Sequence, residues 1–167
     1  MPQSRIIVDG YNLLARRGRL VGQALDLARQ DLIRLFEPLV GDLAERITLV
    51  FDGRSDRSER GEEAGLQLVF SGGQLSADGV IVALVRAEAR PDEILVVSSD
   101  RFVREAAEAA GAQTVASGVF LEQLQARPTR DTRSGLAFRP TLGDLFPAVP
   151  TSALPASSRQ HSHGKDR

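Results

Sequence analysis

The sequence predicts an α/β fold in which helices cover both faces of a central parallel sheet of about five strands. Five short apolar runs, rich in β-branched residues, are spaced along the first 116 residues. These runs are continuous rather than alternating, which is typical of strands buried on both faces. Segments with apolar residues at helical spacing separate them. Alternation of strands and helices indicates right-handed βαβ crossovers and therefore a parallel sheet.

The expected strands are Ile6–Val8, Ile47–Phe51, Leu66–Phe70, Ile94–Val97 and Thr114–Ala116. The expected helices are Val21–Leu43, Ser76–Ala89, Arg101–Ala110 and Ser117–Gln125. Pro38 predicts a kink or a break in the first helix, and Gly111 is expected to end the third. The link Gly53–Gly65 is expected to be a polar loop, because it is too short for a crossover helix.

Composition limits the chemistry available to the protein. The chain has 167 residues, 42% of them apolar and 26% charged, which suits one globular domain. It contains no cysteine, which excludes disulfides, thiol catalysis and cysteine-type zinc sites. No apolar run approaches the length of a membrane span, and the N-terminus lacks the pattern of a signal peptide. We therefore expect a soluble cytoplasmic protein.

Histidine and lysine are confined to the end of the chain. The only lysine is Lys165, and the two histidines are His161 and His163. A Ser-His-Asp triad, a Schiff-base lysine and a histidine general base are therefore excluded from residues 1–125. An enzyme built from this sequence must use carboxylates, hydroxyls, arginines or a metal ion.

Charge divides the chain into two parts. Residues 1–125 carry 14 arginines against 19 acidic residues, whereas residues 126–167 carry 7 basic against 3 acidic residues. We expect residues 1–125 to form the folded domain. We expect residues 126–167 to be a basic tail, rich in Pro, Ser and Arg and largely disordered beyond about residue 150. Such a tail suits a nucleic-acid-binding arm, although solubility alone also explains it.

Aspartates follow three of the expected strands, two of them directly and the third after two serines. They are Asp9, Asp52 and Asp100, and a fourth acid, Asp78, lies in the first turn of an expected helix. Because parallel strands end at the same edge of a sheet, we expect these carboxylates to lie close together. No lysine or histidine can neutralise them, and all-oxygen ligands favour Mg²⁺ or Mn²⁺. Each acid alone also fits an ordinary turn residue or a helix N-cap.

The residues around this edge indicate a phosphodiester substrate. Four arginines are expected near it: Arg16, Arg17, Arg54 and Arg101. Guanidinium groups beside an acidic metal site suit binding of the phosphates that flank a scissile bond. Tyr11 is a candidate for stacking on a base or for packing beside the strand. Asn12 is a candidate for contacting RNA or for orienting Asp9.

Other α/β folds with acidic sheet edges do not fit. A phospho-accepting receiver domain and a haloacid-dehalogenase-type phosphatase both need a lysine, which residues 1–125 lack. The turn after the first strand reads DGYN rather than G-x-G-x-x-G, which argues against a dinucleotide-binding fold.

Several motifs together resemble the YacP-like NYN domains, which belong to the PIN-like metal-dependent ribonucleases. They are IIVDGYNLL at 6–14, VFDG at 50–53, VFSGGQLSADGVI at 69–81, VVSSDR at 96–101 and GAQTVASGVFLEQL at 111–124. The resemblance implies a PIN-like α/β/α fold with the first strand central. It also implies a metal held by Asp9, Asp78 and Asp100, with Asp52 in a supporting place. Similar proteins often carry further acids just after Asp78, whereas residues 79, 80 and 82 are Gly, Val and Val here. This departure leaves fewer ligands for a second metal ion.

The expected function is a metal-dependent endoribonuclease that cleaves single-stranded RNA, with messenger RNA as the expected target, free or ribosome-bound. One alternative is an RNA-binding or adaptor domain that has lost catalysis. Another is the toxin of a toxin–antitoxin pair, because PIN-like folds serve there. The sequence leaves the RNA sequence preference, the number of metal ions and the oligomeric state open.

Overall fold

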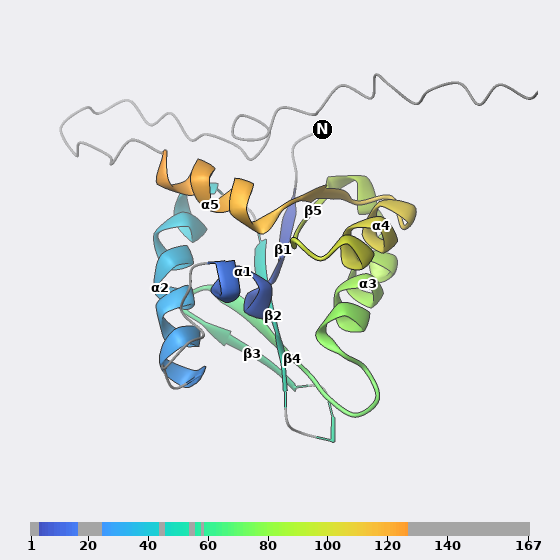
Figure 1. The fold of residues 1–167 in the computed structure, drawn as a ribbon, viewed down its shortest axis with the longest axis horizontal. Helices are drawn as coiled ribbons and strands as arrows, with labels where there is room; N and C mark the ends of the chain where they lie inside the picture. Colours follow the sequence, from blue (N-terminus) through green and yellow to red (C-terminus); the bar gives the residue numbers. More distant parts are fainter. Residues whose placement is uncertain (1–3, 17–24, 44–45, 54–55, 58, 127–167) are drawn as a thin grey trace, which may run out of the picture.

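The computed structural model describes residues 4–16, 25–43, 46–53, 56–57 and 59–126. They form one sheet in the order β3-β4-β2-β1-β5-β6, with helices on both sides (Figure 1). The strands are β1 (Arg5–Asp9), β2 (Arg46–Asp52), β3 (Glu59–Glu63), β4 (Leu66–Ser71), β5 (Ile94–Val97) and β6 (Gln113–Val115). All neighbouring strands pair in parallel except β3, which is antiparallel to β4. The predicted α/β/α fold class is confirmed, and β1 is central as expected.

The helices are α1 (Gly10–Arg16), α2 (Leu25–Leu43), α3 (Ala77–Ala87), α4 (Arg101–Ala109) and α5 (Ser117–Gln125), with a short 3₁₀ helix at Pro91–Glu93. Four of them correspond to the expected helices, and α1 is an addition. The expected break at Pro38 is wrong, because α2 runs without interruption to Leu43. In the part of the chain that the structure describes, no helix is long and apolar enough to cross a membrane.

The strand β3 corrects the expectation of a polar loop over Gly53–Gly65. The chain returns along β3 at the edge of the sheet, antiparallel to β4, so β4 can pair in parallel with β2 without a crossover helix. All five residues of β3 are exposed, because the strand lies at the edge of the sheet. Its charged side chains are typical of an edge strand that must avoid further pairing. Ala64 and Gly65 close the β3–β4 hairpin with positive φ angles of 53° and 79°, as a two-residue type I′ turn requires.

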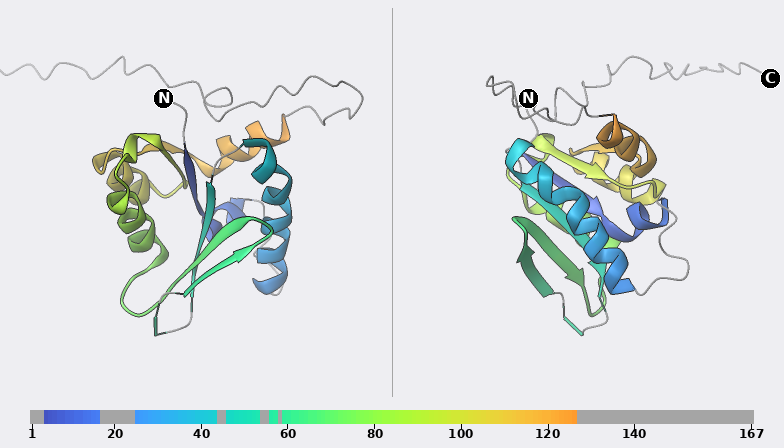
Figure 2. Two further views of the ribbon diagram at one scale, coloured as in Figure 1. Left: turned by 180° about the vertical axis from the view of Figure 1, so that it is seen from behind. Right: turned by 90° about the vertical axis from the view of Figure 1, so that its left-hand side faces the viewer.

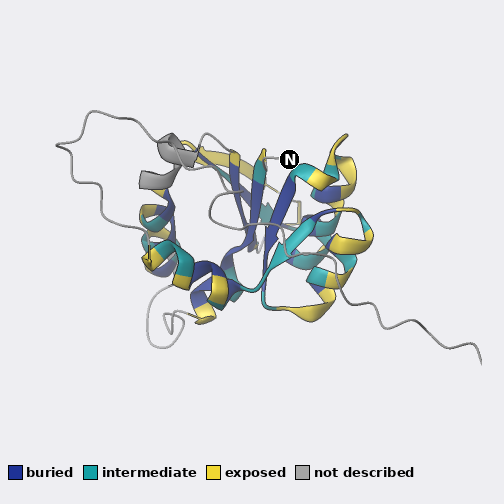
Figure 3. Ribbon diagram, turned by 90° about the horizontal axis from the view of Figure 1, so that it is seen from above, coloured by how far each residue is buried: buried dark blue, intermediate teal, exposed yellow. Residues whose placement is uncertain are grey.

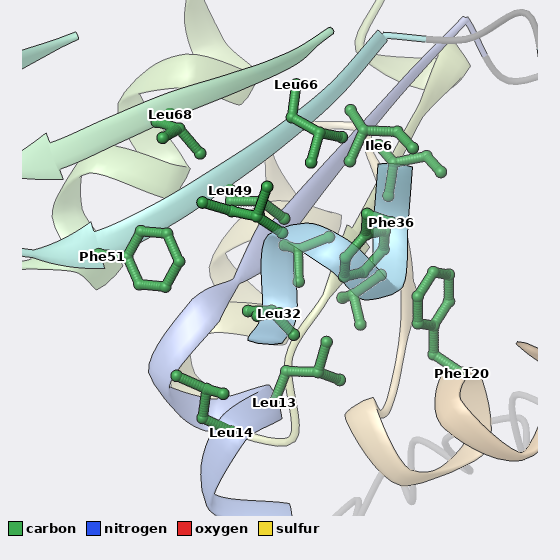
Figure 4. Close-up of a cluster of buried hydrophobic side chains, with 14 of the residues drawn as sticks. Ile6, Leu13, Leu14, Leu32, Phe36, Leu49, Phe51, Leu66, Leu68 and Phe120 are labelled. Atoms are coloured by element: carbon green, nitrogen blue, oxygen red, sulfur yellow. The ribbon is translucent and has the colours of Figure 1, made fainter. Parts of the chain in front are cut away.

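The sheet separates two hydrophobic clusters. Helices α1, α2 and α5 cover one face, and α3 and α4 cover the other (Figures 1 and 2). On the first face, Phe36 of α2 stacks on Phe120 of α5, and both pack with Ile6 and Leu49 of the sheet (Figure 4). Strands β1 and β5 are buried on both faces, as Figure 3 shows by colour. This burial explains their continuous apolar runs.

A polar network lies within the α3 face, toward the amino-terminal ends of the strands. The guanidinium of Arg5 donates hydrogen bonds to Thr48 Oγ1 at 3.2 and 3.3 Å and to Gln67 Oε1 at 3.3 Å. It also forms an ion pair with Glu88, the residue that follows α3. The network joins β1, β2, β4 and α3, and its one cation is balanced by one carboxylate.

Candidate active site

The carboxyl edge of the sheet brings together the aspartates singled out from the sequence. Asp9 and Asp52 end the neighbouring strands β1 and β2, and Asp100 follows β5 on the other side of β1. Asp78 lies in the first turn of α3, which begins at the same edge. The pKa values of two of these acids are raised, first by burial and then by neighbouring charges: Asp78 and Asp52 raise the pKa of Asp9, and Asp100 and Asp52 raise that of Asp78.

Asp9 is the buried member of this group, with 6% of its surface exposed. Its Oδ1 accepts a hydrogen bond from the Asn12 backbone N–H at 3.2 Å, and its Oδ2 accepts one from the Ser98 hydroxyl at 3.0 Å. Burial raises the pKa of Asp9, and the negative charges of Asp78 and Asp52 add to this effect against the two hydrogen bonds. The fold therefore fixes the position of this carboxylate but makes its ionisation less favourable than in water.

Asp52 braces the loop that leads into α3. Its Oδ1 accepts hydrogen bonds from the Ser71 hydroxyl at 3.1 Å and from the Ala77 backbone N–H at 2.9 Å. The Tyr11 hydroxyl donates to the Asp52 backbone carbonyl at 3.3 Å, and the Tyr11 ring meets Phe51 edge-on at 5.6 Å between centroids. Tyr11 is therefore half-buried at the edge, next to the acids.

Asp100 and Asp78 face the solvent more than Asp9 does. Asp100 is the N-cap of α4, where its Oδ1 accepts from the Phe102 and Val103 backbone N–H groups at 2.8 and 3.3 Å. Asp78 accepts no hydrogen bond from any described residue, since Ser76 serves as the N-cap of α3. Burial raises the pKa of Asp78, and the charges of Asp100 and Asp52 raise it further.

Helix N-termini supply the positive field that the acids lack in side chains. Asp9, Asp52 and Asp100 each accept a backbone N–H from the first turn of a helix, namely α1, α3 and α4. The N-terminal end of a helix carries a partial positive charge, which favours a carboxylate there. The helix-capping interpretation and the site interpretation are thus compatible, because the caps are what hold the carboxylates at one edge.

No ion pair involves any of these four aspartates among the described residues. In the same part of the chain, no three acidic side chains converge closely enough to hold a metal ion between them. The oxygens without a hydrogen bond are Oδ2 of Asp52, Oδ2 of Asp100 and both oxygens of Asp78. Mg²⁺ usually keeps several waters and binds through only one or two carboxylates. The donor set therefore fits a partly hydrated hard cation rather than a closed protein cage.

The sequence did not predict a hydrogen-bond network that Asn12, Ser99 and Ser117 form next to the acids. Asn12 Oδ1 accepts from the Ser99 backbone N–H at 2.9 Å and from the Ser117 hydroxyl at 2.8 Å. Ser99 Oγ accepts from the Ser117 backbone N–H at 3.1 Å, so α1, α5 and the end of β5 are joined. The sequence feature that indicates such a network is the pair of serines at 98 and 99, which lie between a buried strand and an aspartate.

The remaining candidates for RNA binding have different positions. Arg16 is exposed in the last turn of α1. Arg101 is exposed beside Asp100 and pairs with Glu105 at 2.6 Å, which raises its pKa through that hydrogen bond. Arg17 and Arg54 lie outside the described residues. Phe102, which the sequence reasoning did not single out, is 69% exposed on the first turn of α4.

Comparison with known proteins supports the fold and the family. The model of the YacP-like NYN domain family matches residues 6–136, which extends beyond the domain boundary expected at residue 125. The chain is similar to the crystal structure of a mutant of Rae1 (YacP) from Bacillus subtilis, with 21% identity, a TM-score of 0.61 and coverage of 73% of this chain and 75% of that chain. A second crystal structure of Rae1 (YacP) from Bacillus subtilis gives 21% identity, a TM-score of 0.57 and coverage of 72% of each chain.

No match was found among the curated proteins. The family match covers the strands and helices that carry all four aspartates, and the structural similarity confirms the PIN-like fold. The chain therefore belongs to the YacP-like NYN domain family, within the PIN-like nuclease superfamily.

Proposed function

We propose that this protein is a metal-dependent endoribonuclease that hydrolyses phosphodiester bonds in single-stranded RNA. One observation carries the proposal: four carboxylates share the carboxyl edge of the sheet, and none has a basic side-chain partner among the described residues. Burial raises the pKa of Asp9 and of Asp78, and the charges of neighbouring aspartates raise both pKa values further. Perturbed carboxylates grouped at a sheet edge are typical of a functional site.

Asp9, Asp78 and Asp100 are the residues that would hold Mg²⁺ or Mn²⁺, directly or through water, with Asp52 beside them. When bound, the ion supplies an activated water and positive charge for phosphodiester hydrolysis. Ser98 orients Asp9 through its hydroxyl, and the α4 backbone orients Asp100. The oxygens of Asp78 and Asp100 that make no hydrogen bond within the described structure are the ones able to face a cation.

Exposed groups around the acids are suited to hold the RNA strand. Arg16 and Arg101 offer guanidinium groups to phosphates, and we assign the same role to Arg17 and Arg54 from the sequence. The exposed ring of Phe102 offers a surface on which an unpaired base can stack. Asn12 uses its side-chain oxygen within the protein, which leaves its amide nitrogen for RNA. Tyr11 keeps part of its ring accessible beside Asp52.

The substrate we propose is single-stranded messenger RNA. Unpaired bases can turn toward aromatic and apolar side chains while the backbone passes the acids, whereas bases in a duplex remain stacked and paired.

The proposal is tested by incubating purified protein with a labelled single-stranded RNA and Mn²⁺. The wild-type protein is expected to cut the RNA internally, and a chelator is expected to abolish the cut. The Asp9→Asn variant keeps the size and shape of the Asp9 side chain but removes its negative charge. Cleavage that persists both with the chelator and in this variant would contradict the proposal.

A second candidate function is RNA binding without cleavage. It is favoured by the finding that no three acidic side chains in the described part of the chain converge on one point. This function predicts that wild-type protein binds the labelled RNA but leaves it intact with either Mg²⁺ or Mn²⁺.

A further inference from the structure

A cavity of about 530 Å³ lies next to the acids, at the end of β2 and β4. Its described lining residues come from two stretches of the chain, one with Asp52, Gly53 and Asp56 and the other with residues 71–76. The volume falls within the range of roughly 300–1,000 Å³ that is typical of small-ligand sites. Because Asp52 belongs both to this cavity and to the acid cluster, a molecule in the cavity lies beside the proposed reaction centre.

The backbones of the two stretches approach each other closely at two glycines. A Cβ atom on Gly53 would lie 2.2 Å from the Ser71 carbonyl oxygen, and one on Gly73 would lie 2.8 Å from the Asp56 carbonyl oxygen. The Ser71 hydroxyl accepts from the Gly53 N–H at 3.4 Å and donates to Asp52. A side chain at either glycine would collide with the facing backbone, so this close approach requires glycine at both positions.

The lining selects the chemistry of the occupant. Among the lining residues that the structure describes, the charged ones are Asp52 and Asp56, and none is basic. A phosphate is repelled by such a lining. Leu75, which is 53% exposed, adds an apolar surface, and Gln74 adds an exposed amide. A flat, neutral group that donates hydrogen bonds from its edge fits these walls.

We infer that this cavity is a subsite for a nucleobase of the RNA, preferring bases with an exocyclic amino group over uracil. The inference rests on the proposed function, because it assigns part of the same substrate. Carboxylates accept hydrogen bonds from the amino group of cytosine, whereas uracil presents a carbonyl there. Neighbouring strands lie about 4.8 Å apart, and β2 lies directly beside β1, which carries Asp9. The base in the cavity therefore belongs to a nucleotide one or two positions from the scissile bond.

The position of Leu75 connects the subsite to the acids. A Cβ atom on Gly79 would lie 3.2 Å from Leu75 Cδ2, so this side chain lies against the first turn of α3, next to Asp78. Leu75 therefore lies both in the lining of the cavity and against the helix that carries Asp78, and its exposed surface is available to the face of a bound base.

A binding measurement tests the subsite without any cleavage. Cytidine and uridine are titrated separately into isotope-labelled wild-type protein, and the backbone amide signals are followed by NMR. We expect cytidine to shift the signals of Gly72, Gly73 and Leu75, and uridine to shift them much less. Equal shifts from the two nucleosides, or shifts confined to other parts of the chain, would overturn the inference.

A cleavage measurement tests it in the substrate. Short RNAs carry cytidine, uridine or an abasic ribose at each position around the cut, and kcat and KM are measured for three proteins. In wild type, one position is expected to favour cytidine over uridine. Leu75→Ala is expected to raise KM by roughly tenfold at that position with little change in kcat. Leu27→Ala removes a comparably exposed leucine, 57% exposed on α2 and outside the cavity lining, and is expected to behave as wild type.

The two measurements separate this inference from the proposed function. If wild type does not cleave RNA, the proposed function fails, and the nucleoside titration still decides whether the cavity binds a base. If wild type cleaves RNA but Leu75→Ala behaves as Leu27→Ala does, the subsite is overturned while the nuclease activity stands.

Discussion

Two polar clusters on the same sheet differ in how their charge is balanced. In the Arg5 network, toward the amino-terminal ends of the strands, one guanidinium meets the Glu88 carboxylate and two neutral acceptors. At the carboxyl edge, four carboxylates meet backbone and hydroxyl donors, and no described basic side chain pairs with them. Among the described residues, the positive charge of the first cluster is balanced by a carboxylate, whereas the negative charges of the second are balanced by no basic side chain.

The difference separates a structural role from a functional one. A half-buried cation that pairs with a carboxylate and donates to two neutral acceptors contributes to the packing of β1, β2, β4 and α3. Burial and neighbouring negative charges raise the pKa of Asp9 and Asp78, so ionisation of these two carboxylates makes the fold less stable, which supports the role in binding or catalysis that we propose for this edge. Substitution of Asp9 should therefore lower activity without loss of stability, whereas substitution of Arg5 should lower stability without loss of activity.

The largest expected effect follows from Asp9→Asn. Cleavage of single-stranded RNA is expected to fall by at least about 100-fold, because the buried carboxylate that would hold the cation is lost. Near wild-type activity of this variant would contradict the distinction between the two clusters, because Asp9 would then contribute no more to cleavage than Arg5 does.

The same variant should be more stable than wild type at neutral pH without metal. The pKa of Asp9 is raised in the folded state, so the folded protein binds this proton more tightly than the unfolded chain does. The free energy of unfolding of wild type therefore falls as pH rises from the ordinary pKa of 3.8 through the raised one. The asparagine side chain that replaces Asp9 does not titrate, so the stability advantage of the variant should grow over that range. Urea unfolding in a chelator at several pH values measures it, and an advantage that does not change with pH would contradict the account.

Removing the cation of the other cluster should act on stability alone. Arg5→Met is expected to lower the free energy of unfolding by about 2 kcal/mol, because Glu88, Thr48 and Gln67 lose their shared donor. Cleavage per folded molecule should stay at the wild-type level. Glu88→Gln keeps a hydrogen-bond acceptor and serves as the milder control. A large loss of activity in folded Arg5→Met protein would remove the distinction between the clusters.

A smaller effect is expected at the β3–β4 turn, which belongs to neither cluster. Ala64 has φ = 53°, a left-handed conformation that L-residues with a Cβ adopt at a cost of roughly 1–2 kcal/mol. Ala64→Asn creates the Asn-Gly pair that type I′ turns favour, and should raise the free energy of unfolding by about 1 kcal/mol. Gly65→Ala, with φ = 79° at that position, should lower it. Thermal unfolding measures both changes, and an unstable Ala64→Asn variant would contradict the turn assignment.

The sequence predicted the parts of this structure that burial determines. The apolar runs that became β1, β2, β4, β5 and β6 are recognisable because each strand is covered on at least one face. The meeting of Asp9, Asp52 and Asp100 follows from the same pattern, because each acid lies within three residues of the end of a run and parallel strands end at one edge.

Elements that depend on strand pairing or on helix capping could not be predicted from apolar runs. The strand β3 has the sequence ERGEE, without one apolar residue, and exists because it pairs with β4. Helix α1 is only seven residues long and depends on the hydrogen bond from Asn12 N–H to Asp9. The role of Ser98 requires knowing that β5 lies beside β1, which single-sequence patterns do not reveal.

The claim that a divalent cation completes the charge of the acid edge is tested most directly by thermal unfolding with and without Mn²⁺. Wild type in a chelator should unfold at a lower temperature than wild type with excess Mn²⁺, because a ligand at about 100 times its Kd adds roughly 2.7 kcal/mol to the folded state. The Asp78→Asn variant, which loses an acid that makes no hydrogen bond within the described structure, should show a much smaller rise. Leu27→Ala should keep the full rise. An equal rise in Asp78→Asn and wild type, or no rise in wild type, would contradict the claim.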